Sequence, residues 1–206
     1  MSDAAYTTLQ SLLWPEQGIS TERDLYLRLH GASAWSDAPQ NELWFDEGGV
    51  VEFNTAFNLF NIGKWLRHCA LADLALRLDG AGRFELLVFQ AMPDRSWERL
   101  VNRVITLEPG TALHVDLSHF ARAEQSGVLY FTLRALEEST LTGAAWETRQ
   151  APQRLPQLAL SITTFKREAA VQASVARFET FMQHSALADH LHLIVVDNGQ
   201  SAGIAA

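Results

Sequence analysis

Two continuous apolar runs, "LALSITTF" from Leu158 and "LHLIVVD" from Leu191, constrain the fold of this chain most strongly. Unbroken apolar runs are typical of strands in parallel sheets, which are buried on both faces. Between them, apolar residues recur at helical spacing and predict an amphipathic helix from about Glu168 to His184. The pattern therefore predicts a βαβ unit.

The residues before these runs follow a different pattern. From Asp24 to about Trp146, stretches such as "DLYLRLHG" and "LADLALRLDG" alternate apolar and polar residues, as half-buried strands do. Turn-forming segments such as "DGAG", "EPGT" and "EQSG" separate the stretches, and "LWFDEGGVVEF" predicts a hairpin around Glu47-Gly48-Gly49. The predicted fold class is mainly β: an N-terminal antiparallel β-sandwich, jelly-roll-like, followed by an incomplete α/β unit.

The segment "RQAPQRLPQ", residues 149–157, interrupts both patterns with two prolines and several polar side chains. Such a change is typical of a domain boundary. We expect a β-sandwich accessory domain over residues 1–150, and a linker with the first βαβ unit of a second domain over residues 151–206.

Composition and charge exclude several classes of partner. The net charge of −8 provides no basic field for a nucleic-acid backbone, so nucleic acid is not an expected partner. No run of about 18 apolar residues predicts a membrane span, and the first residues lack the features of a secretion signal. The single cysteine, Cys69, expected to be buried, fits a reducing compartment. We expect a cytoplasmic protein; peripheral association with the inner face of the plasma membrane and homo-oligomer formation stay open.

Candidate binding residues follow the two buried strands. Thr163, Thr164, Phe165 and Arg167 come at the end of the first, and Asp197 ends the second. In open α/β sheets, ligands bind beyond the carboxyl ends of the strands. Hydroxyls, an aromatic face, a cation and helix amides suit a nucleotide and its phosphates, and a carboxylate can accept from a base or ribose. The alternative is a helix cap and a turn with no ligand, because no glycine-rich phosphate motif is present.

No metal site is expected, because the histidines at 184, 190 and 192 occupy a helix end and a strand start. Several aromatic residues could form a sugar-stacking platform, although such residues more often belong to a core; they are Trp35, Trp44, Phe53, Phe57, Phe60, Trp65 and Trp146.

The order of these segments resembles a known family. "LALSITTFKREAAV" and "LIVVDNGQS" resemble the opening of the catalytic domain of family 2 inverting glycosyltransferases of the GT-A fold. "VVEFNTAFNLFNIGKWLRHCALADLALRLDGAGRFEL", followed by "LTGAAWET", resembles the N-terminal β-sandwich of the polymerising galactofuranosyltransferases. The resemblance covers about Leu9 to Gln200.

This resemblance implies transfer of a sugar, galactofuranose from UDP-galactofuranose, to a glycan acceptor hydroxyl with inversion. It implies that Thr163, Thr164, Phe165 and Arg167 bind the UDP-sugar and that Asp197 contacts the uridine. Lys166 stands where related enzymes often have asparagine. The family's Mg²⁺- or Mn²⁺-binding Asp-x-Asp pair and catalytic base are expected after Ala206, so this chain alone should hold no cofactor and be inactive. The alternative is a noncatalytic carbohydrate-binding or assembly module.

Overall fold

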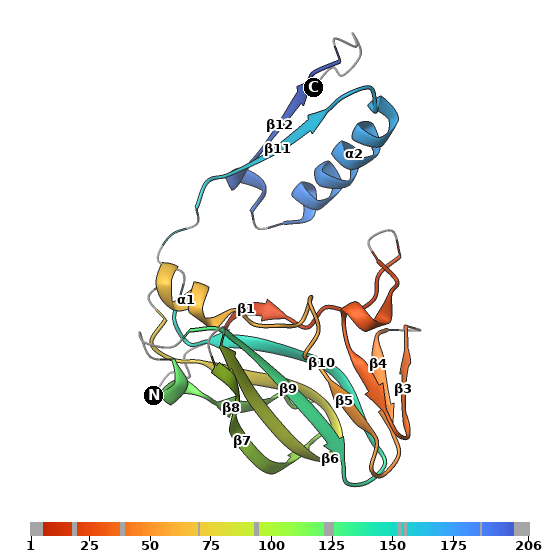
Figure 1. Ribbon diagram of the computed structural model, residues 1–206, viewed down its shortest axis with the longest axis vertical. Coiled ribbons are helices and arrows are strands. Elements are labelled where there is room, and N and C mark those ends of the chain that lie inside the picture. Colours follow the sequence, from red (N-terminus) through yellow and green to blue (C-terminus); the bar gives the residue numbers. More distant parts are fainter. Residues whose placement is uncertain are drawn as a thin grey trace. The chain divides into compact units, whose positions relative to one another are not determined.

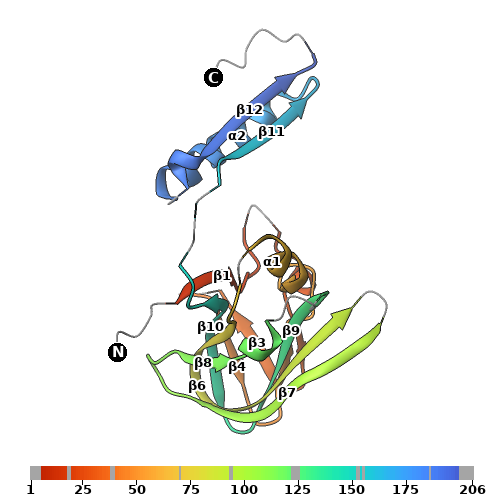
Figure 2. The same cartoon turned by 90° about the vertical axis from the view of Figure 1, so that its left-hand side faces the viewer.

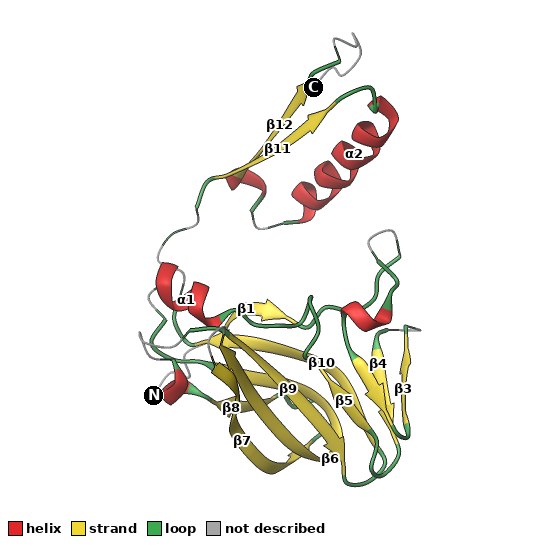
Figure 3. Cartoon of the chain, viewed as in Figure 1, coloured by secondary structure: helices red, strands yellow, loops and turns green. Residues whose placement is uncertain are grey.

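The computed structural model describes residues 6–17, 20–37, 40–69, 71–92, 95–121, 126–151, 154, 156–185 and 187–199. Two compact units divide the chain, Met1–Ala151 and Pro152–Ala206. The first unit is almost entirely β-structure, and the second combines two strands with a long helix (Figures 1 and 3). No helix within the described ranges is long and apolar enough to cross a membrane.

The first unit is an antiparallel β-sandwich of ten strands, which confirms the predicted fold class for this part. In one layer β10 pairs with β1, β4 and β6, β4 also pairs with β3, and β6 with β8. In the other layer the order is β2-β5-β9-β6-β7. The strands are β1 (Thr7–Ser11), β2 (Arg28–His30), β3 (Ser33–Ser36), β4 (Glu42–Phe45), β5 (Val50–Glu52), β6 (Ala75–Met92), β7 (Arg95–Leu107), β8 (Leu113–Asp116), β9 (Val128–Ala135) and β10 (Ser139–Thr148).

Strand β6 belongs to both layers. It pairs with β8 and β10 up to Ala81, and with β7 from Gly82 onward. The turn expected at "DGAG" is therefore wrong, because these residues lie inside one strand. Gly82 has a φ of +104°, and a Cβ there would lie 2.2 Å from the Ser139 hydroxyl oxygen. The glycine thus allows β10 to approach closely rather than reversing the chain.

The hairpin predicted around Glu47-Gly48-Gly49 is also wrong. The strands on its two sides, β4 and β5, pair with different neighbours, so this turn links one layer to the other. The pattern of "DLYLRLHG" likewise begins with a short 3-10 helix, Arg23–Leu25, and becomes strand β2 only at Arg28. Alternating apolar residues locate strands but carry no information about which strands pair.

One continuous hydrophobic core fills the space between the layers. Phe45 of β4 and Phe84 of β6 meet edge to face at 5.3 Å, and Phe60 stacks on Trp146 at 5.0 Å. A short helix, α1 (Ile62–His68), buries Ile62 and begins at Asn61, whose side chain accepts from the Lys64 amide. The 3-10 turn Ser118–Phe120 follows β8. Cys69, expected to be buried, is exposed just after α1.

The second unit is a βαβ unit with a parallel strand pair. It contains β11 (Leu158–Thr164), α2 (Glu168–His184), the 3-10 turn Ala188–His190 and β12 (Leu191–Asp197). The helix lies against one face of the two strands (Figure 2). Ile194 and Val196, which alternate with the half-buried Leu193 and Val195, are 48% and 42% exposed.

Candidate functional site

The carboxyl ends of β11 and β12 lie side by side, and this brings the two predicted loops together (Figure 1). Thr164 stands opposite Asp197 in the parallel register. The Asn198 amide donates a 2.9 Å hydrogen bond to the Thr164 carbonyl oxygen, which extends the pairing one residue beyond the strands. The two loops therefore form one continuous edge.

The first loop passes from strand to helix within three residues. Phe165 is 61% exposed, and the Lys166 ammonium lies 5.2 Å from the centre of its ring. Lys166 has a φ of +51°, a backbone conformation that is uncommon for residues other than glycine. Arg167 is the exposed N-cap residue of α2, and its side chain makes no capping hydrogen bond. Thr164 therefore does not cap the helix.

Thr163 and Thr164 point to opposite faces of the strand pair. Thr164 is 6% exposed, whereas Thr163 is exposed, as expected for successive residues in a strand. The structure thus pairs Thr164 with Asp197 and leaves Phe165 and Arg167 exposed in the loop that follows Thr164. It places the Thr163 side chain on the face that carries Ile194 and Val196.

Two side chains at the strand ends are held differently. The buried Thr164 hydroxyl oxygen has no hydrogen-bond partner among the described residues. The Asp197 carboxylate accepts a 2.8 Å hydrogen bond from the Gly199 amide, which shapes the second loop into an Asx-type turn. A buried hydroxyl without a partner costs free energy, so the Thr164 hydroxyl is a candidate for contact with a ligand at this edge.

The electrostatics of the first loop, at the start of α2, suit an anion, whereas the second loop carries the Asp197 carboxylate. The first amide groups of an α-helix have no acceptor within the helix, and the helix dipole places partial positive charge there. α2 is 17 residues long, and Lys166 and Arg167 directly precede it. Cationic side chains next to free amide donors are the usual components of phosphate-binding loops.

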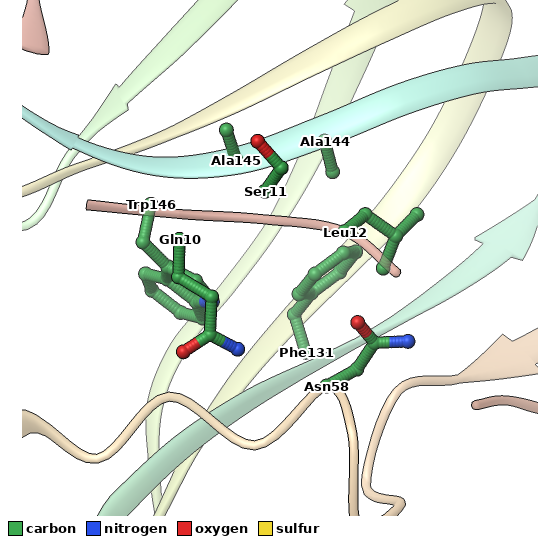
Figure 4. Close-up of a pocket in the computed structure, with 8 residues that line it drawn as sticks. All are labelled: Gln10, Ser11, Leu12, Asn58, Phe131, Ala144, Ala145 and Trp146. Atoms are coloured by element: carbon green, nitrogen blue, oxygen red, sulfur yellow. The ribbon is translucent and has the colours of Figure 1, made fainter. Parts of the chain in front are cut away.

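A pocket in the sandwich is structural rather than functional. It lies between β1, β10 and the segment that carries Asn58, and it has room for about one water molecule (Figure 4). The Asn58 side chain is fully engaged, because it donates to the Leu13 and Tyr26 carbonyl oxygens and accepts from the Leu13 amide. A sugar does not fit this space.

A buried carboxylate, which the sequence analysis missed, lies on the outer face of the sandwich. The Glu147 side chain is 3% exposed, and its oxygens contact Arg77 Nη1 at 3.0 Å and His114 Nε2 at 2.9 Å. Thr8 donates to the same carboxylate at 3.3 Å. The partners are 33 to 139 residues away in sequence, so no local pattern signals the cluster. Because each oxygen is engaged, we assign this cluster a structural role.

Most of the aromatic residues considered for a sugar-stacking platform belong to the core, as the alternative interpretation expected. Phe53, Phe60 and Trp146 are buried in the core, and Trp35 and Trp65 pack against it. Trp44 and Phe57 are 50% and 37% exposed and lie in different parts of the chain. In the described ranges, no group of three or more His, Cys, Asp or Glu side chains could hold a metal ion.

Comparison with known proteins identifies a matching protein family. Residues 9–149 match the family model described as galactofuranosyltransferase 2 N-terminal. A search of curated proteins finds no significant match.

Among solved structures, the C-terminal family 22 carbohydrate-binding module of Clostridium thermocellum Xyn10B shares 5% identity at a TM-score of 0.36, covering 62% of this chain and 88% of its own. A mutant of a family 29 carbohydrate-binding module shares 11% identity at a TM-score of 0.36, covering 70% and 89%. Peruvianin-I, a cysteine peptidase from Thevetia peruviana latex, shares 15% identity at a TM-score of 0.23, covering 61% and 64%. At TM-scores this low, these similarities support no conclusion about the function of the chain.

The family match extends over both layers of the sandwich, from β1 through β10, and over most of the chain. The chain belongs to the family of galactofuranosyltransferase 2 N-terminal domains.

Proposed function

We propose that this chain is the N-terminal part of an inverting glycosyltransferase that transfers galactofuranose from UDP-galactofuranose to a glycan hydroxyl. The observation that carries the proposal is the pairing of Thr164 with Asp197 beside the start of α2, in a chain whose sandwich belongs to this family. In this interpretation the βαβ unit opens a GT-A domain, and its strand-end edge is half of the donor site.

Each group at the edge has a chemical role in this proposal. Arg167 and the first amides of α2 bind the diphosphate, and the exposed ring of Phe165 offers a surface for the uracil base. The Asp197 carboxylate accepts a hydrogen bond from the base or ribose. Thr164 offers its hydroxyl at the junction of the two loops. Thr163 contributes from the backbone, because its side chain lies on the other face.

The reaction itself is a single displacement. The acceptor hydroxyl oxygen bonds to the anomeric carbon as the bond from that carbon to the diphosphate breaks, so UDP leaves and the configuration inverts. The described residues position the leaving group; we assign no catalytic base among them. In the full-length enzyme a Mg²⁺ or Mn²⁺ ion supplies charge neutralisation of the diphosphate. We assign no metal ligands among the described residues, so UDP binding, rather than turnover, is the property to test in this chain.

UDP binding to the chain tests the donor site. Titration of the ¹⁵N-labelled chain with UDP should shift the amide signals of Arg167, Asp197 and Asn198. Arg167→Ala should weaken binding about tenfold, because a charge-assisted hydrogen bond contributes roughly 1.5–3 kcal/mol. Arg177→Ala removes the same charge ten residues further along α2 and serves as the matched control. Equal weakening by both variants, or no shift at either loop, would contradict the assignment.

A further inference from the structure

Three aromatic side chains lie in line on the outer face of the second layer, and we call them the aromatic row: Trp97, Phe89 and Tyr130. They come from β7, β6 and β9, with β6 in the middle and Phe89 directly opposite Tyr130. The Phe89 and Tyr130 rings stack with centroids 5.1 Å apart, and Trp97 meets Phe89 edge to face at 5.4 Å. The rings therefore form one connected surface.

The aromatic row faces away from the core. The residues next to Phe89 and Tyr130 along their strands, such as Val88 and Phe131, point inward and are at most 2% exposed. Trp97 is 62% exposed, and Phe89 and Tyr130 are half-buried. Single exposed apolar side chains are ordinary on protein surfaces, but three touching rings are the kind of patch that marks a binding surface.

Hydrogen-bonding groups border the aromatic row on the β5 side. The strand register continues from Glu52 opposite Thr132, and the Phe53 amide bonds to the Phe131 carbonyl oxygen, which places Asn54 next to Tyr130. The Asn54 amide donates to the Glu52 carboxylate at 3.1 Å, and the Glu52 side chain is 33% exposed. Burial, and secondarily the negative charge of Glu52, raise the pKa of Tyr130, so its phenol stays neutral and able to donate.

This combination matches a neutral sugar better than other ligands. Sugar rings present C–H faces that pack on aromatic rings, and hydroxyl edges that donate to carboxylates and accept from a phenol. Charges of both signs flank the row: Glu52 lies 3.5 Å from His30 on the β5 side, and the exposed Arg99 stands opposite Phe89 on β7. No field of a single sign is therefore present to select a phosphate-bearing ligand. Charged residues beside the rings also disfavour a protein partner, because the centres of protein interfaces are depleted of charged residues.

We propose that the aromatic row binds an oligosaccharide, with Trp97 as its main stacking residue. Adjacent strands are about 4.8 Å apart, so a row across three strands spans about 10 Å, enough for a short glycan rather than a single sugar. The identity of the glycan as a galactofuranose oligomer rests on the proposed function. The ability of this face to bind a glycan does not depend on it. The chain would then hold the donor at one unit and a glycan at the other.

Calorimetry with the complete 206-residue chain tests this inference. The probes are a galactofuranose oligosaccharide and, as a comparison, a cello-oligosaccharide. Trp97→Ala should weaken glycan binding at least tenfold, and Tyr130→Phe, which removes only the hydroxyl, should weaken it less. Trp44→Ala is the matched control, because Trp44 is a tryptophan of similar exposure on β4, in the other layer. Because Trp97 is largely exposed, the variant should keep its circular dichroism spectrum and melting temperature.

The outcomes separate this inference from the proposed function. Galactofuranose binding that Trp97→Ala abolishes and Trp44→Ala preserves supports both. Trp97-dependent binding of the cello-oligosaccharide alone supports a glycan-binding face and counts against galactofuranosyl transfer. The inference is overturned if neither oligosaccharide binds, or if Trp97→Ala and Trp44→Ala weaken glycan binding equally. The UDP titration then tests the donor site independently. Self-association that Trp97→Ala removes, without glycan binding, also overturns it.

Discussion

Thr164 and Asp197 stand opposite each other at the ends of two parallel strands, and the Asn198 amide bonds to the Thr164 carbonyl oxygen at 2.9 Å. This relationship joins a residue at the helix entrance with a carboxylate 33 positions later. It converts two separate loops into a single edge. The backbone of this edge is fixed by strand pairing, so its side chains can be exchanged without moving it.

Replacement of Thr164 by valine separates the contribution of its hydroxyl to strand stability from its contribution to UDP binding. The Thr164 hydroxyl oxygen is buried and has no partner among the described residues, so its removal relieves an unpaired polar group. Thr164→Val should therefore stabilise the β11–β12 pair by about 1 kcal/mol, measured by amide hydrogen exchange in these strands. The same variant should bind UDP more weakly if the hydroxyl contacts the ligand. A destabilised strand pair would show that the hydroxyl has a structural partner instead.

Gly82 should tolerate no side chain. Its φ is +104°, and a Cβ would lie 2.2 Å from the Ser139 hydroxyl oxygen and 3.0 Å from the Ser139 Cα. Gly82→Ala should lower the free energy of unfolding by about 3 kcal/mol or more, from backbone strain plus overpacking. Gly110→Ala is the control, because Gly110 also has a positive φ, +73°, but nothing lies near its Cβ position. It should cost only about 1 kcal/mol of strain. Urea unfolding of both variants measures the difference, and equal losses would rule out the steric contribution.

The stability of the sandwich should depend on the ion pair between Arg77 and Glu147. Arg77→Met leaves the 3% exposed carboxylate of Glu147 without its guanidinium partner. Because breaking one side of a buried ion pair is costly, and Arg77 is itself partly exposed, we expect a loss of about 2 kcal/mol. The double variant Arg77→Met with Glu147→Gln should recover part of this loss. A double-mutant cycle by denaturant unfolding gives the coupling, and additive effects would argue against the ion pair.

Acid stability should depend on Asp116. The hydroxyl of Ser118 and, secondarily, its amide donate to this carboxylate and lower the pKa of Asp116 below its usual value of 3.8. A lowered folded-state pKa contributes stability above the unfolded-state pKa, and that stability is lost as the pH falls through the folded-state value. Ser118→Ala should therefore be less stable than the wild type at pH 7, and the difference should shrink below about pH 4. Urea unfolding at pH 7 and pH 3 measures both values; a difference that does not change with pH would exclude this hydrogen bond as its source.

Sequence patterns predicted the second unit better than the first. The helix from Glu168 to His184 has the predicted bounds, and both strands form and pair in parallel, because helical spacing and continuous apolar runs are local signals. The predicted burial on both faces is wrong for the described residues, because Ile194 and Val196 are exposed. Strand positions in the sandwich were also predicted, as for "STLTGAAWETR". The pairing of these strands was not, because a glycine-rich segment signals a turn whether it reverses the chain or, as at Gly82, lets another strand approach.

The candidate sites differ in the same way. The strand-end residues of the βαβ unit follow from topology, so Thr164 and Asp197 were expected to meet. The aromatic row was missed because its members come from three strands. Trp97 lies in β7, a strand whose sequence "RSWERLVNRVITL" suggests no alternation as clear as that of its neighbours. Which face of a strand a ring occupies depends on the partner strands, and these are known only from the fold.

The passage of β6 through both layers has a consequence for how the sandwich comes apart. Neither layer can lose its hydrogen bonds without disturbing a strand that the other layer shares. We expect the sandwich to melt as a single cooperative unit, with the amides of Leu78 and Leu86 becoming accessible to solvent exchange only through global opening. A rigid body of this kind cannot flex between its layers, so a glycan held on one face would keep a fixed orientation with respect to the whole sandwich.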